Sequence, residues 1–320
     1  MKSIKWIAVL MALLLCLSGC AGARQGSGSY NIYLIAKSST TEFWKAVFSG
    51  ANAAKSEYNV HLTILAPDTE EDFETQNDYI RQAVADGADA IVFSAISYTE
   101  NAAAIDEAVA AGVRVVVIDS DVNSSGVSVR IGTDNIAAGR MSAEAALKTE
   151  QEEIVVGIVN AYAETQNCRE REQGFREALL MDSRVKGIYA VNVATDALEA
   201  QTAAEKLLRD HPEINVLIGL NEPLAVGVAQ AVDSLGLTGQ VHAVSFDSNI
   251  NCIELLQTGA VAALVVQNSY AMGYLGVEKA WQVLQGEKFD STALIDTATT
   301  IVTKENMFTM ESQKAMFSFG

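Results

Sequence analysis

Residues 113–135 read VRVVVIDSDVNSSGVSVRIGTDN and contain two short runs rich in β-branched residues, 113–118 and 127–131. Asp119 directly follows the first run, and Asp134 closely follows the second. A short apolar run that is bounded by polar turn residues is typical of a strand buried on both faces. The stretch therefore predicts two strands of a covered parallel sheet, each with an acidic side chain near its end.

The same alternation of apolar strands and amphipathic helices continues on both sides of this stretch. Before it, strands are predicted at 32–36, 61–66 and 90–94, and helices at 42–58, 72–86 and 99–111. After it, the pattern restarts with strands at 154–159, 187–193, 216–220, 241–246 and 262–267, helices at 136–149, 169–181, 197–210, 223–234, 250–258 and 270–285, and an extended tail around 296–302. Alternating strands and helices form parallel sheets that helices cover on both faces. The two blocks therefore predict two doubly wound α/β lobes.

The composition excludes several classes of protein. The chain has 320 residues, 49% of them hydrophobic and 19% charged, so it is long enough for two domains and is not disordered in bulk. Lys and Arg number 22 against 40 Asp and Glu, which gives a formal net charge of −18. A chain this acidic lacks the basic face that nucleic acid binding requires, and an anionic membrane surface repels it. We therefore expect no nucleic acid partner, and any membrane link must be covalent or spanning.

The first twenty residues, MKSIKWIAVLMALLLCLSGC, have the pattern of a secretory signal. Two lysines precede an apolar run at 7–17, which is too short to cross roughly 30 Å of hydrocarbon as a helix. The stretch ends in Leu-Ser-Gly-Cys, which resembles a bacterial lipobox and implies removal of residues 1–19 and attachment of lipid to Cys20. Residues 20–29 would then tether the protein to the extracytoplasmic face of the cell membrane. The alternative is a plain signal peptide in which Cys20 is incidental.

The sequence offers no pattern for a metal site, a nucleotide cofactor or a catalytic centre. The three histidines have no metal-site spacing, and neither block opens with a glycine-rich phosphate loop. No nucleophile stands beside a suitable base. Cys168 and Cys252 could pair in an exported compartment, although two separate buried thiols are the favoured interpretation. We therefore expect a binding protein rather than an enzyme, with no cofactor.

Polar and aromatic residues follow the predicted strands where a ligand would bind. In doubly wound sheets, ligands lie beyond the carboxyl ends of the strands. Carboxylate, amide and guanidinium groups at such positions suit the hydroxyl groups of a sugar or polyol, and aromatic rings suit its C–H face. The candidate ligand-binding residues are Lys37, Thr41, Phe43, Trp44, Asp119, Arg169, Asn221, Asp247 and Gln267.

Ordered landmarks along the chain carry a family resemblance. They are Phe43-Trp44 after the first strand, Asp119, the segment GTDN at 132–135, REREQGF at 169–175, Asn221-Glu222, SFD at 245–247 and Gln267. Each is weak alone, but their order and spacing together are specific. From residue 30 to about 302 the chain resembles the ribose-binding branch of the type I periplasmic substrate-binding proteins, which capture sugars for ABC transporters.

The resemblance implies two doubly wound lobes joined by three crossings of the chain. One lobe would comprise residues 30–133 with 268–295, and the other 134–267 with 296–320. The crossings would act as a hinge that includes Thr133, Asp134, Asn268 and Asp296. The lobes would close on a monosaccharide or related polyol, and the closed monomer would dock on an ABC permease.

The resemblance also implies roles for the site residues. Phe43 and Trp44 would flank the sugar, and its hydroxyls would hydrogen-bond to Asp119, Arg169, Asn221, Asp247 and Gln267. Arg171 would be structural, and Glu222 would join the lobes or cap a helix. The family's Asn, Arg and aromatic positions are here Thr41, Ser120 and Thr195, and Lys37 stands where a small hydroxyl residue is expected. Lys37 would pair with an acidic ligand group or, alternatively, orient Asp119, so a ligand other than ribose is expected.

Three rival functions remain to be weighed against sugar delivery. A sensor that docks on a histidine kinase or chemoreceptor would share all of these features. A transcriptional repressor of the same fold is disfavoured because a signal peptide stands where a helix-turn-helix would be. An enzyme is disfavoured because catalytic pairings are missing. The apolar tail at 301–320 is expected to pack on a lobe or to form a contact surface.

Overall fold

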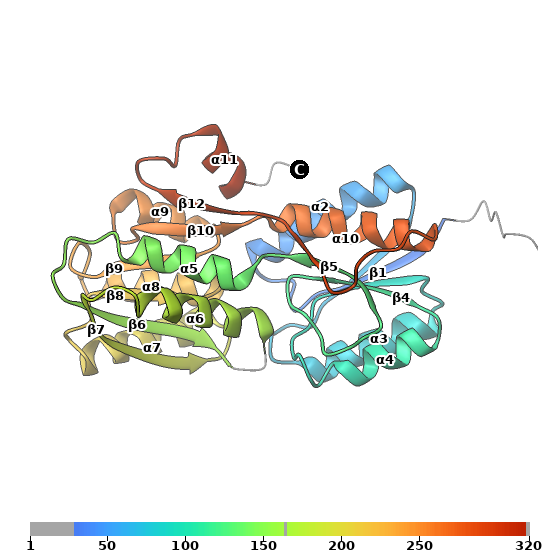
Figure 1. Ribbon diagram of the computed structural model, residues 1–320, viewed down its shortest axis with the longest axis horizontal. Coiled ribbons are helices and arrows are strands. Elements are labelled where there is room, and N and C mark those ends of the chain that lie inside the picture. The colour runs from blue at the N-terminus through green and yellow to red at the C-terminus, as the bar shows by residue number, and fades with distance from the viewer. Residues whose placement is uncertain (1–28, 163–164, 318–320) are drawn as a thin grey trace, which may run out of the picture.

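The two β-branched runs on either side of Asp119 form neighbouring parallel strands, β4 (Arg114–Ile118) and β5 (Val127–Gly132). Their apolar side chains are buried because helices cover both faces of the sheet. The computed structural model describes residues 29–162 and 165–317, and in it two such sheets form two α/β lobes, which confirms the predicted fold class (Figure 1). The predicted signal peptide and Cys20 lie outside the described residues.

The first lobe is built on a six-stranded parallel sheet in the order β11-β5-β4-β3-β1-β2. Its other strands are β1 (Asn31–Ile35), β2 (His61–Leu65), β3 (Ala90–Phe93) and β11 (Leu294–Asp296). Helices α2 (Glu42–Tyr58) and α10 (Ser269–Leu284) pack together on one face, and α3 (Phe73–Ala85) and α4 (Ala102–Ala110) pack together on the other. Two separate stretches of the chain therefore build this lobe.

The second lobe repeats the arrangement with a sheet in the order β12-β10-β9-β8-β6-β7. Its strands are β6 (Ile154–Ala161), β7 (Val185–Val193), β8 (Val216–Gly219), β9 (His242–Phe246), β10 (Ala263–Gln267) and β12 (Thr299–Thr303). The helices on its two faces are α5 (Asn135–Ala146) with α6 (Gln166–Leu179), and α7 (Ala197–Asp210) with α8 (Glu222–Ser234). Helix α9 (Ile250–Thr258) packs beside α8. Strands β4 and β9 thus occupy the same place in their respective sheets.

The edge strand β12 departs from the all-parallel prediction, since it pairs with β10 in antiparallel fashion. Only Thr297 and Ala298 separate it from β11 in the first lobe. A parallel neighbour in the same sheet needs a long crossover, whereas a strand that arrives directly from the other lobe can add to the edge in the opposite sense. The extended tail predicted around 296–302 is thereby divided between the two sheets.

The chain passes between the lobes at three places, from β5 to α5, from β10 to α10 and from β11 to β12. Hydrogen bonds tie the first and third crossings to each other. The Thr297 backbone N–H donates to the Gly132 carbonyl oxygen at 2.8 Å, and the Asp134 backbone N–H donates to Asp296 Oδ1 at 3.2 Å. Ala298 has a φ of 62°, the left-handed conformation, where the chain turns into β12.

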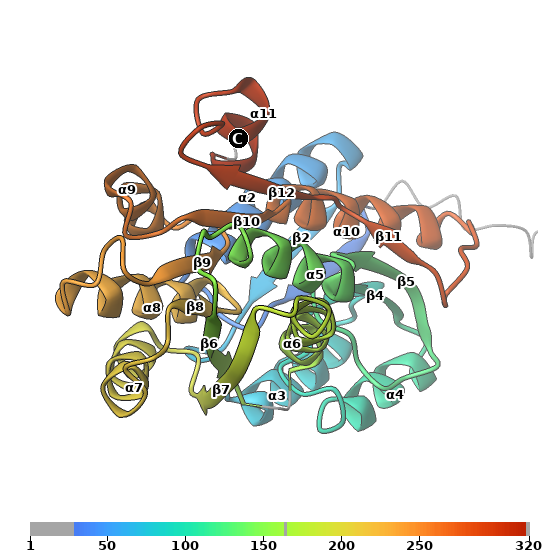
Figure 2. The same ribbon diagram turned by 60° about the vertical axis from the view of Figure 1, so that its left-hand side comes forward.

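The C-terminal tail packs on the second lobe rather than extending into solvent. Helix α11 (Met310–Met316) lies beyond β12 in both views (Figures 1 and 2). Met307 and Met316 join the apolar cluster of α8, α9 and β10, whereas Phe308 and Met310 are exposed. Cys168 and Cys252 are both buried and both free. Among the described residues, no helix combines the length and the apolar character that crossing a membrane demands.

Candidate functional site

Asp119 and Asp247 occupy equivalent positions in the two lobes, at the carboxyl ends of β4 and β9. Both have positive φ, 57° for Asp119 and 65° for Asp247, a conformation that is uncommon for residues other than glycine. In each case the backbone N–H donates to the neighbouring strand, to the Ile131 carbonyl at 3.0 Å and to the Val265 carbonyl at 2.9 Å. The repeated sharp bend places both carboxyl groups on one cavity between the lobes.

The wall from the first lobe is a cluster of charged side chains around Lys37. Lys37 Nζ lies 3.0 Å from Glu70 Oε2 and 3.5 Å from Asp119 Oδ2. Trp44 Nε1 donates to Glu70 Oε1 at 2.9 Å. Burial disfavours the Lys37 ammonium, but Glu70 and Asp119 more than offset that effect and hold the pKa of Lys37 above its ordinary value. Lys37 therefore stays charged and orients Asp119, which is one of the two roles that the sequence left open.

The wall from the second lobe is centred on Gln267, the last residue of β10. Its Nε2 donates to Asp247 Oδ1 at 2.9 Å, and its Oε1 accepts from Arg171 Nη2 at 2.6 Å. The Arg171 guanidinium is buried and also lies 4.4 Å from the centroid of the Phe246 ring. Burial raises the pKa of Asp247 to about 7, although Arg171 and the hydrogen bond from Gln267 favour its charged form.

The two walls are in direct contact. Asn167 Nδ2, in the first turn of α6, donates to Asp119 Oδ1 at 2.9 Å. The Glu222 carboxylate at the start of α8 accepts from the backbone N–H groups of Glu42, at 3.1 Å, and Phe43, at 2.7 Å. These N–H groups form the amino end of α2, where a helix favours a negative charge. Glu222 thus joins the lobes, as the sequence indicated.

Helix caps orient several of the remaining candidates. Thr41 Oγ1 accepts from the Trp44 backbone N–H at 3.3 Å and begins α2, and Asn221 Oδ1 accepts from the Leu224 backbone N–H at 3.1 Å and begins α8. At the crossings, Asp134 caps α5 and Asn268 caps α10. Thr133 Oγ1 donates to Gln267 Oε1 at 3.0 Å, so the first crossing also contacts the site.

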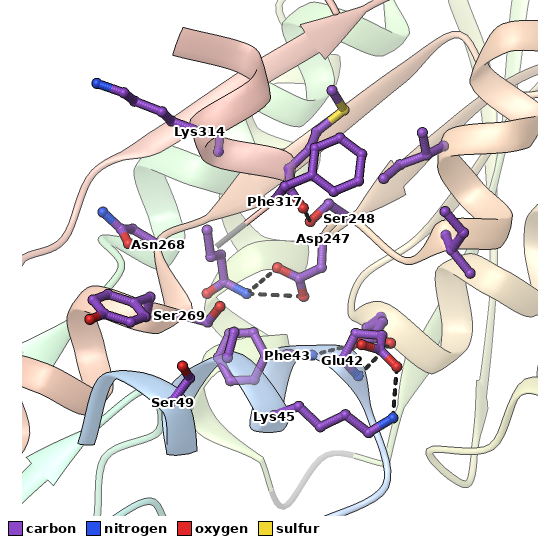
Figure 3. Close-up of a pocket in the computed structure, with 18 residues that line it drawn as sticks. Glu42, Phe43, Lys45, Ser49, Asp247, Ser248, Asn268, Ser269, Lys314 and Phe317 are labelled. Atoms are coloured by element: carbon purple, nitrogen blue, oxygen red, sulfur yellow. Dashed lines mark hydrogen bonds and ion pairs between the residues drawn. The ribbon is translucent and has the colours of Figure 1, made fainter. Parts of the chain in front are cut away.

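Two adjoining cavities lie where the walls meet. The inner cavity is small, about 20 Å³, and eight of the nine candidate residues line it: Lys37, Thr41, Phe43, Trp44, Asp119, Asn221, Asp247 and Gln267. The outer cavity is about 770 Å³ and is drawn in Figure 3. The two share Phe43, Glu222, Asp247 and Gln267. Within 29–162 and 165–317, no group of three or more His, Cys, Asp or Glu side chains is arranged to hold a metal ion.

The ninth candidate, Arg169, is not brought into either cavity. Its side chain is exposed, donates a hydrogen bond to Gln166 and lies 5.9 Å from the centroid of the Tyr98 ring. Arg171 lines the inner cavity instead. Two residues along an α-helix differ by about 200° in direction, so Arg169 and Arg171 cannot both face the site.

The sequence contains a pattern that favours Arg171 over Arg169 as the residue that faces the interior. Cys168, Arg171, Phe175 and Leu179 follow the spacing of a helix face, and all four are buried. An arginine within an apolar stripe points inward. Glu70 and Asn167, two further cavity residues that the sequence prediction missed, lie in the segments that follow β2 and β6.

Known proteins similar to this chain are named as sugar-binding components. The D-ribose/D-allose-binding protein of Pseudomonas aeruginosa is 26% identical over 284 residues, which cover 85% of this chain and 88% of that protein. Among solved structures, a carbohydrate transporter solute-binding protein from Agrobacterium radiobacter, in complex with D-arabinose, has a TM-score of 0.85 at 28% identity and covers 91% of this chain and 100% of that one. An ABC transporter solute-binding protein from Agrobacterium vitis, with bound D-fucose, has a TM-score of 0.86 at 27% identity and covers 90% of this chain and 100% of that one.

A family model described as a periplasmic binding protein domain matches residues 32–288, which span both lobes. The match confirms the predicted family, and with it a binding protein rather than an enzyme. The sequence predicted two lobes with an aspartate at a strand end in each, and the structure has both lobes, with the two aspartates lining one cavity between them. The chain belongs to the periplasmic binding protein domain family.

Proposed function

We propose that this protein binds a neutral sugar or related polyol, with one sugar ring in the crevice between its lobes, and delivers it to an ABC permease. The observation that carries the proposal is the convergence of Asp119 and Asp247, from different lobes, on one cavity that Phe43 and Trp44 also line. The sugars after which the similar proteins are named, or with which they form complexes, support the same class of ligand. Several of these proteins are named as import proteins, which favours transport over sensing.

The charges of the site favour a neutral ligand over an acidic one. The Lys37 ammonium already lies between Glu70 and Asp119, and Arg171 faces Gln267, with Asp119 Oδ1 at 3.9 Å from its Nη2. An acidic sugar would bring a further negative charge beside these carboxylates and would be disfavoured. We assign Asp119 and Asp247 as acceptors from sugar hydroxyls, and Arg171 takes the donor role expected of Arg169.

Binding would proceed by opening and closing of the lobes. The inner cavity of about 20 Å³ has room for about one water molecule but not for a sugar ring, so a sugar enters only after the walls separate. The rigid bodies would be residues 30–133 with 268–295, and 134–267 with 296–320. Motion at the three crossings, around Thr133, Asp134, Asn268 and Asp296, would separate them. A sugar that contacts both lobes then shifts the population toward the closed form.

The permease and the anchor complete the proposal. The family is periplasmic, and the lipobox-like end of the apolar run supports a lipid on Cys20, which would hold a monomer near its permease on the extracytoplasmic face of the membrane. More than one acyl chain is needed for stable anchoring. Mass spectrometry of the protein purified from bacterial membranes would detect the lipid on Cys20.

A binding screen tests the central claim. Purified protein is tested by thermal shift and titration calorimetry with D-ribose, D-allose, D-arabinose, D-fucose, D-glucose and D-galactose, and with D-glucuronate as the acidic probe. We expect at least one neutral sugar to raise the melting temperature and to bind with a Kd on the order of 1 μM, about −8 kcal/mol, with D-glucuronate weaker. If neither these sugars nor disaccharides bind, the proposed function is wrong.

A matched pair of variants then tests the site. Arg171→Ala should weaken binding of the tightest sugar by about 100-fold or more, because it removes the buried guanidinium that donates to Gln267 and leaves the Leu220 carbonyl oxygen without that donor. Arg169→Ala, two residues away and exposed, should leave the Kd within about twofold. Circular dichroism confirms that both variants fold. Equal losses of sugar affinity in the two variants, or a loss of affinity only in Arg169→Ala, would contradict the assignment of Arg171 to the site.

A further inference from the structure

The outer cavity, which we call the vestibule, is the feature that a single bound monosaccharide does not use. Its volume of about 770 Å³ lies within the range of roughly 300–1,000 Å³ that is usual for small-molecule sites. It adjoins the inner site, because Phe43, Asp247 and Gln267 line both cavities. A ligand held by Asp247 therefore lies beside the vestibule, and separation of the lobes would move the shared wall.

One wall of the vestibule is the C-terminal helix α11, which lies beyond residues 32–288, the part of the chain that the family model matches. Lys314 and Phe317 line the cavity from this segment, and Ser248 lines it from the loop after β9. Ser248 Oγ donates to the Met316 carbonyl oxygen at 3.0 Å, and the Met316 side chain is buried among α8 and α9. The wall is therefore fixed by core packing and a hydrogen bond.

The opposite wall comes from the first lobe. Phe43 lines the vestibule from α2, and Tyr270 lines it from the first turn of α10. In Figure 3, Phe43 and Phe317 lie on opposite sides of the Asp247 carboxylate, and the exposed Lys314 side chain extends from α11 away from that carboxylate, at the rim of the vestibule. The vestibule thus combines aromatic rings from three segments with hydroxyl groups and with an ammonium group at its rim, which is the chemistry that recognises a pyranose or furanose ring.

We propose that the natural ligand is a disaccharide or longer saccharide, with one ring in the inner site and a second ring in the vestibule between Phe43 and Phe317. Ser248 Oγ, whose proton is donated to the Met316 carbonyl oxygen, accepts a hydrogen bond from one hydroxyl of the second ring. Lys314 turns in from the rim of the vestibule and donates to another hydroxyl. Closure of the lobes holds both rings, because the vestibule, like the inner site, has walls from both lobes. This inference rests on the proposed function and names its substrate class.

Calorimetry on the purified protein tests the inference. The monosaccharide that binds tightest in the screen is compared with disaccharides that carry it at either end, in both anomeric forms. If no monosaccharide binds, maltose, cellobiose, lactose and melibiose are used instead. We expect the best disaccharide to bind at least tenfold tighter than its component monosaccharide.

Four variants locate the second ring. Lys314→Ala and Phe317→Ala should each weaken disaccharide binding by about five- to tenfold and leave monosaccharide binding within about twofold. Lys304→Ala and Phe308→Ala are matched controls, since both side chains are exposed in the same tail and neither lines the vestibule. The controls should change neither affinity.

The possible failures are distinguishable. If a monosaccharide binds and every disaccharide binds more weakly, the inference is overturned and the proposed function stands. If the disaccharide binds more tightly but the Lys314 and Phe317 variants do not affect it, the second ring lies elsewhere and the inference is again overturned. If neither class of sugar binds, the proposed function fails and the inference fails with it. If only disaccharides bind and Phe317→Ala weakens their binding, the result supports both the proposed function and the inference.

Discussion

The two strand-end aspartates are equivalent in backbone geometry but differ in how their charge is balanced. Asp119 lies within reach of the Lys37 ammonium and accepts hydrogen bonds from Ser94 and Asn167. Asp247 receives its hydrogen bonds from a neutral amide, that of Gln267. Burial without a directly paired cation explains why the pKa of Asp247 is raised to about 7.

This difference predicts a pH-dependent stability of the unliganded protein. Because the pKa of Asp247 is higher in the folded state than the ordinary value of 3.8, the protonated carboxyl group stabilises the folded protein. This contribution to the unfolding free energy is complete below pH 3.8 and is lost as the pH rises through about 7. Asp247→Asn removes the titrating group. Between pH 5 and pH 8, the unfolding free energy of the wild type should therefore fall by about 2–3 kcal/mol relative to the variant. Urea unfolding at the two pH values measures this change.

The control for this prediction is Asp68→Asn, which changes an exposed aspartate in the same way. Its unfolding free energy should follow that of the wild type at both pH values. A constant difference between the wild type and Asp247→Asn from pH 5 to pH 8 would show that Asp247 is already ionised at pH 5.

At the scale of elements, the helix pair α2 and α10 links one of the crossings to the site. Helix α2 begins with Glu42 and Phe43, and α10 begins directly after Asn268 in the second crossing. The two backbones meet at Gly50 and Gly273, where a Cβ atom would lie 2.0 Å from the Tyr270 carbonyl oxygen and 1.9 Å from the Val47 carbonyl oxygen. Only glycine, which has no Cβ atom, lets the two helix backbones approach this closely.

Gly273→Ala should therefore be destabilising. The added methyl group forces the two helices apart, and overpacking of this kind costs about 1–3 kcal/mol or more. Urea unfolding measures the loss. Gly187→Ala in β7 is the matched control, because its nearest atom is a Val155 side-chain carbon at 3.6 Å, an ordinary contact. Equal stability of Gly273→Ala and the wild type would mean that the helices are less closely packed than described.

For the whole molecule, the arrangement of the lobes is held by contacts on more than one side of the crevice. Glu222 bonds to the amino end of α2, the Thr195 backbone N–H donates to Glu71 Oε1 at 2.6 Å, and Thr165 Oγ1 donates to the Ile96 carbonyl oxygen at 3.3 Å. These contacts favour the closed form without a ligand. A bound sugar adds only the interactions that it makes with both walls.

Glu222→Gln should shift the unliganded protein toward an open form. The glutamine retains one carbonyl acceptor, but its amide group then faces a helix N–H, and the charge that favours the helix terminus is gone. Small-angle X-ray scattering should show a larger radius of gyration, which returns toward the wild-type value with saturating sugar. The Kd should rise about tenfold, because a smaller fraction of the protein is closed.

Glu42→Gln is the matched control for this shift. Glu42 lies at the same helix terminus, but its side chain is exposed and pairs with Lys45 in its own lobe. Its variant should scatter like the wild type. An unchanged radius of gyration in Glu222→Gln would mean that the other contacts alone keep the lobes together.

The sequence by itself determined the features that depend on neighbours along the chain. Strands and helices followed from residue spacing, and helix α2 begins and ends where it was predicted, because capping and periodicity are local. The rule that ligands lie at strand ends brought eight of the nine candidates to the inner cavity. For Glu222 the sequence left two roles open, and its contacts with the backbone of Glu42 and Phe43 agree with the joining of the lobes.

Only the tertiary structure decided which groups from distant segments meet. The rotation of α6 in its packing places Arg171, and not Arg169, at the site, and the loop after β2 brings Glu70 to Lys37. The tail forms a wall of the vestibule because Met307 and Met316 are buried in a cluster most of whose members come from α8, α9 and β10, far away in sequence. Such contacts depend on packing in three dimensions, which residue spacing does not encode.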